Sequence, residues 1–192
     1  MKIPIVIIIN GPAAAGKTTI GRAIAEKLRL PFICKDDFKE LLFDNLGWSD
    51  AAWSKRLGKA SFEILWHVVG VLVRAGNSMI IETKFDPKAA VDKFSKLKKD
   101  NNFKVFELNF HASREVLLER FKLRAATVRH PGHVDLTRAE EYAANLNNGR
   151  IDHLNLPGIT IIDIDTTDFE KVDIDQIVLE IKKAVKMVRE KI

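Results

Sequence analysis

The chain has 192 residues, of which 46% are hydrophobic and 30% charged, and it carries a formal net charge of +5 with a pI of about 9.3. A hydrophobic content of this size fills the core of one domain and excludes an extensively disordered chain. The positive charge favours anionic partners, but it is too small to choose among nucleotides, phosphorylated metabolites and nucleic acids.

Cysteine content and hydropathy bear on the compartment. The single cysteine, Cys34, cannot form a disulfide within the chain, which favours a reducing environment. The longest uncharged run, residues 3 to 16, is interrupted by Asn10, Gly11 and Pro12, so it is too broken to span a bilayer. We therefore expect a cytoplasmic protein with no membrane partner.

Short apolar runs rich in β-branched residues alternate with helical patterns along the chain. These runs lie at residues 5–9, 31–34, 78–82, 103–110 and 159–164. The alternation predicts an α/β fold with three layers, α/β/α, around a mostly parallel five-stranded sheet. We expect one domain over residues 1–192, with a helical lid at about residues 120–153.

The loop after the first strand reads GPAAAGKT over residues 11–18 and fits GxxxxGK[ST], with a strand before it and a helix after it. Its glycines permit backbone angles that would clash with a β-carbon, so successive amide protons can turn inward and form a concave anion site. We expect Lys17 to bind the β- and γ-phosphates of a nucleotide and Thr18 to offer its hydroxyl to Mg²⁺. The predicted nucleotide-binding residues of this loop are Gly11, Ala13, Ala14, Ala15, Gly16, Lys17, Thr18 and Thr19.

Two carboxylates follow the second strand. Asp36 and Asp37 should face the same crevice as Lys17, because the carboxyl ends of parallel strands lie along one edge of a sheet. A carboxylate there can orient an acceptor hydroxyl and take its proton, and Asp36 is the candidate base. The alternative is structural, since an aspartate before a helix is an ordinary N-cap.

The loop resembles that of the small P-loop kinases. The run KDDF at residues 35–38, followed by Lys39, is similar to the branch that includes polynucleotide kinase, zeta-toxin and chloramphenicol phosphotransferase. The resemblance implies the P-loop NTPase fold, with Asp36 as base, Asp37 at the acceptor, and Lys39 assisting the transferred phosphate or the acceptor.

A long helical pattern over residues 50–75 is rich in apolar residues, and we expect it to be well buried, with Trp48, Trp53 and Trp66 nearby in the core. Glu82 ends the next strand and so lies at the same edge of the sheet as Asp36. It could accept a Mg²⁺-bound water or hold a substrate hydroxyl, and the run IIETKF resembles the equivalent strand of zeta-toxin-like kinases. A surface glutamate at a strand end is the alternative.

Arginines gather in the predicted lid. Arg120 and Arg124 are four residues apart on one helical face, and Arg129 lies in the loop before HPGH. Guanidinium groups that arrive as a lid closes would stabilise the charge on the moving phosphate and exclude water, whereas solvated helix arginines are the alternative. We expect Arg124 and Arg129 to act in catalysis and Arg120 to bind the nucleotide.

Three further features belong to the lid and the segment after it. His130 and His133 lack the companions of a zinc site, so we expect them in lid contacts or substrate recognition. Thr137 with Glu140 predicts a capping box. By resemblance to such kinases, the turn after the last strand, residues 165–167, would lie beside the adenine.

Together these features predict an ATP-dependent kinase that uses ATP and Mg²⁺, with Lys17, Asp36, Arg124 and Arg129 as catalytic residues. Asp37, Lys39 and Glu82 would bind the substrate, a hydroxyl-bearing small molecule, with a nucleic-acid 5′ end as a less favoured acceptor. Two alternatives stay open: a nucleoside or nucleotide kinase resembling adenylate kinase, and a nucleotide-dependent switch or ATPase. The acceptor and the oligomeric state cannot be read from the sequence.

Overall fold

The computed structural model describes residues 3–146 and 148–190. The strands are β1 Ile5–Asn10, β2 Phe32–Cys34, β3 Met79–Glu82, β4 Lys104–His111 and β5 Thr160–Asp165. The α-helices are α1 Lys17–Leu28, α2 Lys35–Leu46, α3 Ala51–Arg74, α4 Pro87–Asp100, α5 Arg114–Thr127, α6 Ala139–Asn145 and α7 Ile174–Glu190. Short 3₁₀ helices span η1 Pro131–His133, η2 Asp135–Arg138 and η3 Phe169–Lys171.

All five strands run parallel in the order β2-β3-β1-β4-β5, as the alternation of strand and helix patterns predicts. In the centre of the sheet, Ile8 of β1 lies opposite Ile81 of β3 and Glu107 of β4. Every residue of β1 is buried, because helices cover both faces of a strand that is almost wholly apolar. The parallel arrangement brings the carboxyl ends of β1, β2 and β3 to one edge of the sheet.

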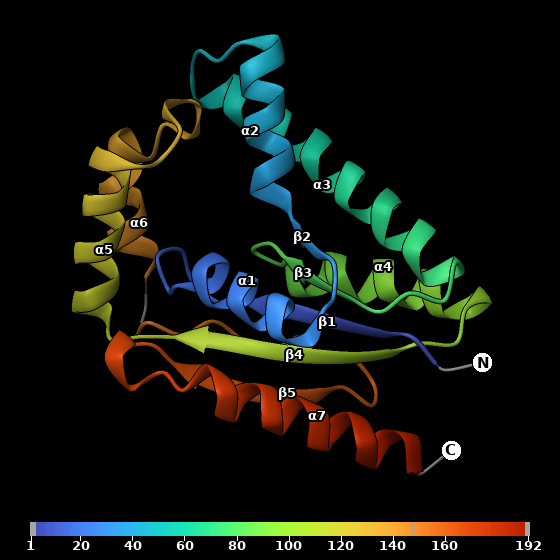
Figure 1. Cartoon of the computed structure of the whole chain (residues 1–192). Helices are drawn as coiled ribbons and strands as arrows, with labels where there is room; N and C mark the ends of the chain where they lie inside the picture. Colours follow the sequence, from blue (N-terminus) through green and yellow to red (C-terminus); the bar gives the residue numbers. More distant parts are fainter. Residues whose placement is uncertain (1–2, 147, 191–192) are drawn as a thin grey trace.

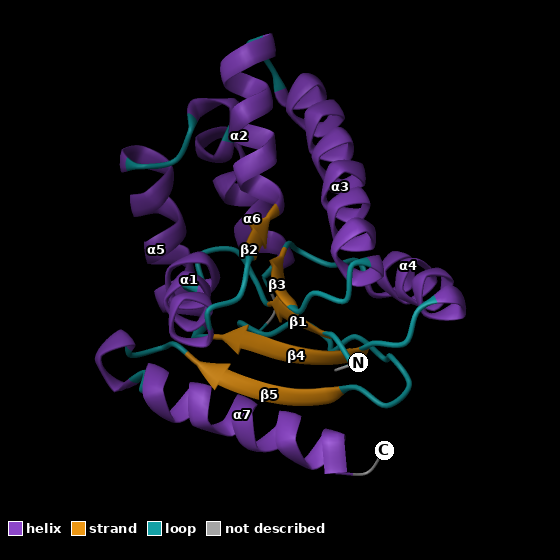
Figure 2. Ribbon diagram, turned by 45° about the vertical axis from the view of Figure 1, so that its right-hand side comes forward, coloured by secondary structure: helices purple, strands orange, loops and turns teal. Residues whose placement is uncertain are grey.

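Helices pack on both faces of the sheet and complete three layers (Figure 1, Figure 2). On one face, α1, α5 and α7 bury residues such as Ile24, Leu117 and Ile181. On the other face, α3 and α4 bury Leu65 and Phe94. The predicted α/β/α architecture is confirmed.

The prediction for α3 and the tryptophans is partly wrong. Trp66 is buried against the sheet, but the side chain of Trp48 is 50% exposed. Val71 of α3 is 46% exposed, since this helix buries one stripe of residues and presents the opposite face to solvent. An apolar-rich sequence therefore overstated the burial of this helix.

Helix ends show which capping signals hold. Asp86 accepts a hydrogen bond from the amide of Ala89 at 2.8 Å, and Ser113 accepts one from the amide of Val116 at 3.3 Å, so each caps the helix that follows it. The capping box at Thr137 is wrong. This residue lies inside η2, and its hydroxyl donates back to the carbonyl of Val134, while α6 begins at Ala139 without a side-chain cap.

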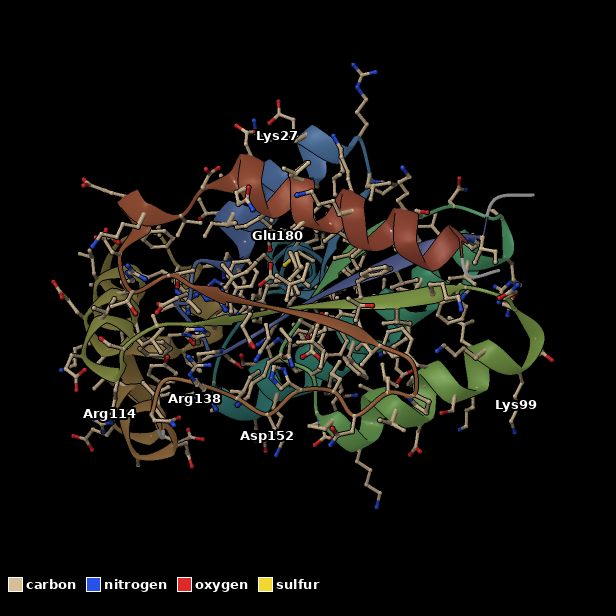
Figure 3. All side chains as sticks on the ribbon, turned by 90° about the horizontal axis from the view of Figure 1, so that it is seen from below. Lys27, Lys99, Arg114, Arg138, Asp152 and Glu180 are labelled. Atoms are coloured by element: carbon tan, nitrogen blue, oxygen red, sulfur yellow. The ribbon has the colours of Figure 1, made fainter. Side chains whose placement is uncertain are left out.

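Charged side chains lie on the outer faces of the helices, among them Lys27 of α1, Lys99 of α4 and Glu180 of α7 (Figure 3). Over residues 3–146 and 148–190, none of the helices combines the length and the apolar character that crossing a membrane requires.

Candidate active site

The loop between β1 and α1 has a backbone that its sequence explains. Gly11 has φ of 141°, and a β-carbon there would lie 2.5 Å from the carbonyl oxygen of Phe110 on β4. Gly16 has φ of 74°, and Ala14 adopts the left-handed region at 63°. Only glycine tolerates both the close approach at Gly11 and its backbone angle, so the loop depends on it.

Several loop carbonyls are held by hydrogen bonds from other parts of the molecule. The ammonium of Lys17 donates to the carbonyl of Pro12 at 2.6 Å, the phenol of Tyr142 donates to Ala13 at 2.7 Å, and the hydroxyl of Thr166 donates to Ala15 at 3.1 Å. A concave anion site needs a loop backbone fixed in shape before the ligand arrives. The lid helix α6 and the turn after β5 thus help to fix this loop.

Lys17 and Thr18 occupy the first turn of α1. Burial lowers the pKa of the Lys17 ammonium, with Glu82 opposing the shift. The hydroxyl of Thr18 donates to Glu82 Oε2 at 2.8 Å, which places two hard oxygen ligands side by side at the edge of the sheet. Oxygen ligands are the kind that Mg²⁺ prefers, so Thr18 and Glu82 fit a magnesium site.

Asp36 lies in the first turn of α2, directly after β2. Arg129 Nη2 donates to its carboxylate at 2.7 Å, and Lys35 Nζ lies 3.2 Å away. Burial by itself would raise the pKa of Asp36, but the charges of Lys35 and Arg129 outweigh it and hold the pKa well below its usual range. The carboxylate is therefore ionised at neutral pH.

The neighbouring Asp37 points elsewhere. It forms an ion pair with Arg22 of α1 at 2.8 Å on the surface, and it does not line the cavity that Asp36 faces. Consecutive residues of a helix project about 100° apart, so one member of the doublet can face the cavity while the other faces solvent. The structure does not bring Asp37 together with the other predicted substrate-binding residues.

The three predicted arginines take different positions. Arg124 and Arg129 both bond to Asp135, at 3.2 and 3.1 Å, and Arg129 continues to Asp36. Arg120 instead donates to the carbonyls of Thr166 and Thr167 at 2.7 and 3.2 Å. Its guanidinium also lies 4.0 Å from the ring centre of Phe169, so Arg120 sits beside the turn after β5.

Residues His130 and His133 seat the lid on α2. An arginine can only donate, so the 3.0 Å contact with Arg129 Nη2 makes His133 Nδ1 an acceptor. His133 Nε2 then donates to Glu40 at 2.9 Å, and burial lowers the pKa of His133 toward this neutral form. His130 stacks on Phe43 with 5.0 Å between ring centres. Among the described residues, no cluster of three metal-binding side chains occurs.

A cavity of about 550 Å³ joins these parts. The predicted residues that line it are Ala13, Ala14, Gly16, Lys17, Thr18, Thr19, Asp36, Lys39, Glu82, Arg120, Arg124 and Arg129. The predicted residues Gly11 and Ala15 do not line the cavity. Gly11 packs against Phe110, and the buried Ala15 accepts a hydrogen bond from Thr166 through its carbonyl. Lys35, Lys84, Tyr142 and Phe169 also line the cavity and were not predicted as site residues, since even the KDDF and IIETKF runs assign no role to their lysines. The one available signal was that Tyr142 is the single tyrosine of the chain.

A parallel sheet, a glycine-bearing loop after its central strand and a cavity at its carboxyl edge define the class of P-loop nucleotide-binding proteins. The family can be stated as well. The model of the AAA domain family matches residues 6–148, and the chain belongs to this family.

Solved structures share the whole fold. The chain is 35% identical to a "putative kinase" from Chloroflexus aurantiacus j-10-fl, with a TM-score of 0.85 over 95% of this chain and 98% of that one. A gluconokinase from Sinorhizobium meliloti 1021 is 18% identical, with a TM-score of 0.51 over 100% and 97% of the two chains. A sugar kinase from Janibacter sp. HTCC2649 is 16% identical, with a TM-score of 0.55 over 98% and 95%. None of the curated proteins compared with the chain matches it.

The resemblance to P-loop kinases that the sequence indicates is confirmed by this fold and family.

Proposed function

We propose that the protein is an ATP-dependent kinase that transfers the γ-phosphate to a hydroxyl group of a small molecule, with Asp36 as the base. The observation that carries this proposal is that one cavity holds both the phosphate-binding loop and the Asp36 carboxylate. Membership of the AAA domain family, with the 35% identical protein described as a kinase, supports the enzyme class.

The loop and the first turn of α1 bind the nucleotide. Backbone amides of the loop and the Lys17 ammonium hold the phosphates. Arg120 and Phe169 border the place that the nucleobase of ATP occupies. Thr18 and Glu82 would hold Mg²⁺, which neutralises phosphate charge when it is bound.

Asp36 orients the acceptor hydroxyl and takes its proton. The hydroxyl oxygen forms a bond to the γ-phosphorus, the bond from that phosphorus to the β–γ bridging oxygen breaks, and ADP leaves with that oxygen. Arg124 and Arg129 stabilise the charge on the transferred group. When Arg129 turns from Asp36 to the phosphate, the pKa of Asp36 rises because it loses its nearest cation, and the carboxylate becomes a better proton acceptor.

Substituting the two neighbouring carboxylates separately tests this assignment. We expect Asp36→Asn to lower kcat for phosphate transfer by about 100- to 10,000-fold, while the affinity for ATP stays within about twofold. Asp37→Asn, one position along the same helix, should keep its activity because Asp37 faces Arg22 outside the cavity. Radiolabelled ATP with a panel of alcohols, sugars, nucleosides and antibiotics provides the assay. Unchanged ATP turnover in Asp36→Asn would contradict the kinase mechanism and favour an ATPase or switch.

A further inference from the structure

Arg129 is held by acceptors from both the lid and α2. Its Nη2 donates to Asp36 at 2.7 Å and to His133 Nδ1 at 3.0 Å, while its Nε donates to Asp135 at 3.1 Å. The guanidinium group is a planar fork, so three acceptors around it fix its plane as well as its place. His133 and Asp135 lie on the lid, and they are the acceptors that stay with Arg129 when it leaves Asp36 for the phosphate.

The ring of His133 can accept from Arg129 only when Nδ1 carries no proton. The proton of the neutral ring then lies on Nε2, and a buried N–H group needs an acceptor. Glu40 Oε1 provides one at 2.9 Å from Nε2, and the His133 side chain is only 3% exposed. The hydrogen bond from His133 lowers the pKa of Glu40, which is therefore an ionised group that can only accept. With the proton on Nδ1 instead, two donors would face each other at 3.0 Å.

Glu40 lies outside the place of the chemistry. It is not among the described residues that line the cavity, and its side chain is 38% exposed. Its own contact with Arg129, from Nη1 at 3.5 Å, is longer than its contact with His133. Glu40 follows Asp36 by four residues on α2, so the two carboxylates share the side of this helix that faces the lid (Figure 1). An effect of Glu40 on the reaction must therefore pass through His133 and Arg129.

We propose that Glu40 is a positioning residue for phosphate transfer. By accepting the Nε2 proton of His133, it keeps the bare Nδ1 turned toward Arg129 and so holds the guanidinium group between the Asp36 base and the transferred phosphate. The inference rests on the proposed kinase function and adds to it a residue outside the cavity. Arg129 touches the transferred group in that mechanism, whereas Glu40 acts on the group only through His133 and Arg129.

The pKa of Asp36 distinguishes positioning from a direct effect of the Glu40 charge. Glu40 and Asp36 repel each other, so deleting the Glu40 charge alone would lower the pKa of Asp36 further. Loosening Arg129 would raise the pKa of Asp36, because Arg129 is one of the cations that hold it down. The other titratable groups that act on Asp36 remain present in Glu40→Ala, and they are Lys17, Cys34, Lys35, Lys39, Arg124 and His133. An acidic limb in the kcat/KM profile of Glu40→Ala is therefore the signature of positioning.

Two substitutions of Glu40 test the proposal. The assay uses γ-labelled ATP and the member of the panel of alcohols, sugars, nucleosides and antibiotics that the wild-type protein phosphorylates. Because a displacement of about 1 Å can cost about 100-fold in rate, we expect Glu40→Ala to lower kcat by about 10-fold, with the KM for ATP within about twofold. Its kcat/KM profile should show an acidic limb between pH 3 and 9 that the wild type lacks. Glu40→Gln still offers an acceptor to His133, so its kcat should stay within about threefold of the wild type.

Asp44 provides a matched control on the same helix. It lies four residues after Glu40 and pairs with the other histidine of the lid segment, His130, at 3.3 Å. Asp44→Ala should leave kcat and the pH profile unchanged, because His130 makes no contact with the Arg129 side chain among the described interactions. An equal loss in Asp44→Ala, an equal loss in Glu40→Gln, or a Glu40→Ala profile without an acidic limb would overturn the inference.

Nitrogen NMR of protein labelled at its histidines tests the contact without any acceptor. At pH 7 we expect His133, assigned by comparison with His133→Gln, to carry its proton on Nε2 in the wild type and in Glu40→Gln. Glu40→Ala should show both tautomers, since the acceptor for Nε2 is gone. A proton on Nδ1 in the wild type would overturn the inference.

A double-mutant cycle asks whether Glu40 acts through Arg129. If it does, Glu40→Ala combined with Arg129→Ala should have a kcat within about twofold of Arg129→Ala alone. Losses that multiply would overturn the inference and leave the kinase function intact. If the wild type transfers phosphate to no member of the panel while ATP binding is preserved, the kinase function is overturned and this inference with it.

Discussion

The Asp36 carboxylate lies between two cations, and this governs how it responds to pH. Its low pKa in the folded protein means that it stabilises the fold at neutral pH and that this contribution is lost as the pH falls below the unfolded value of about 3.9 toward the lower folded value. The same cations keep it ionised, and therefore able to accept a proton, over the neutral range.

Replacing Arg129 should move this titration. Arg129→Ala removes the nearest cation, so the pKa of Asp36 rises and the acidic limb of the kcat/KM profile shifts to higher pH. Phosphate transfer should also fall by at least about tenfold, because the guanidinium stabilises the transferred group. Activity measured from pH 3 to 9 checks both effects, with the exposed Arg56→Ala as the control; the wild type should show no acidic limb in this range, whereas Arg129→Ala should show one. An unmoved acidic limb would show that Asp36 is not the titrating group.

Lys39→Met should make the fold more stable at neutral pH. The pKa of Lys39 is lower in the folded protein than in the unfolded chain, so between pH 8 and about 10.4 the unfolded chain binds more protons and stability rises with pH. Below pH 8 the buried charge costs stability, and a methionine of similar length removes that cost. We expect the free energy of unfolding to rise by about 1 kcal/mol at pH 7, after the lost bond to Ser54 is allowed for, and the gain to shrink above pH 8.

Urea denaturation at pH 7 and pH 10 measures this difference. A variant that is less stable than the wild type at pH 7 would mean that the ammonium is better compensated than its contacts with Ser54 and Phe43 indicate.

A residue of the site could be predicted from the sequence where a local motif determines which way its backbone or side chain points. The loop residues follow from one motif whose backbone geometry is self-contained. The sequence did not show that only Asp36 of the two aspartates faces the cavity, because the direction of each side chain depends on where α2 begins, at Lys35. Lys35 and Lys84 stand in the KDDF and IIETKF runs, but those runs assign them no role, and only the folded chain shows that both line the cavity.

At the scale of elements, the lid packs closely against α2 around Phe43. A β-carbon on Gly132 of η1 would lie 2.7 Å from the ring of Phe43, which is almost fully buried on α2. The rings of His130 and His133 contact the same phenylalanine, face to face and edge to face. The position of Arg129 therefore depends on how closely this segment approaches Phe43.

Gly132→Ala should push the segment away from α2. Because a displacement of about 1 Å at a site can cost about 100-fold in rate, we expect kcat to fall by about 10- to 100-fold. Amide hydrogen exchange over residues 129–138 should become faster, since the docking contact is weakened. Val128→Ala is the matched control, because Val128 is 81% exposed. Normal exchange together with normal kcat in Gly132→Ala would refute the importance of this contact.

Helices and strands with a clear pattern of apolar residues could be predicted from the sequence, and segments without such a pattern could not. All five strands lie within a residue or so of their expected limits, because buried parallel strands are continuous apolar runs. The capping box at Thr137 failed because two 3₁₀ turns, tied by Asp135 to Arg124 and Arg129, precede α6. Ion pairs to residues 11 and 6 positions earlier in the chain set that geometry, and the capping pattern does not report them.

At the scale of the molecule, a buried carboxylate joins the sheet to the chain that follows the lid. Glu107 of β4 is fully buried and accepts hydrogen bonds from the side chain of Asn10 and the amide of Leu154, each at 2.9 Å. The parallel order of strands could be predicted from the alternation of elements. This network could not, because its members lie 97 and 47 residues apart in sequence.

Glu107→Ala should lower the stability of the whole fold. It leaves the side chain of Asn10 and the amide of Leu154 buried without an acceptor, which should reduce the free energy of unfolding by about 2–4 kcal/mol. Urea denaturation provides the measurement, with the exposed Glu115→Ala as the control. A loss below about 0.5 kcal/mol would show that water or a rearranged neighbour replaces the carboxylate.

Tyr142 is a suitable position for a spectroscopic probe of nucleotide binding. Its phenol bonds to Ala13 in the loop while its ring stacks on Phe121, and the chain contains no second tyrosine. A fluorinated tyrosine supplied during expression would therefore put one fluorine nucleus at the contact between α6 and the phosphate-binding loop. Its resonance would follow the arrival and departure of a nucleotide in a chain that carries no other substitution and no attached dye.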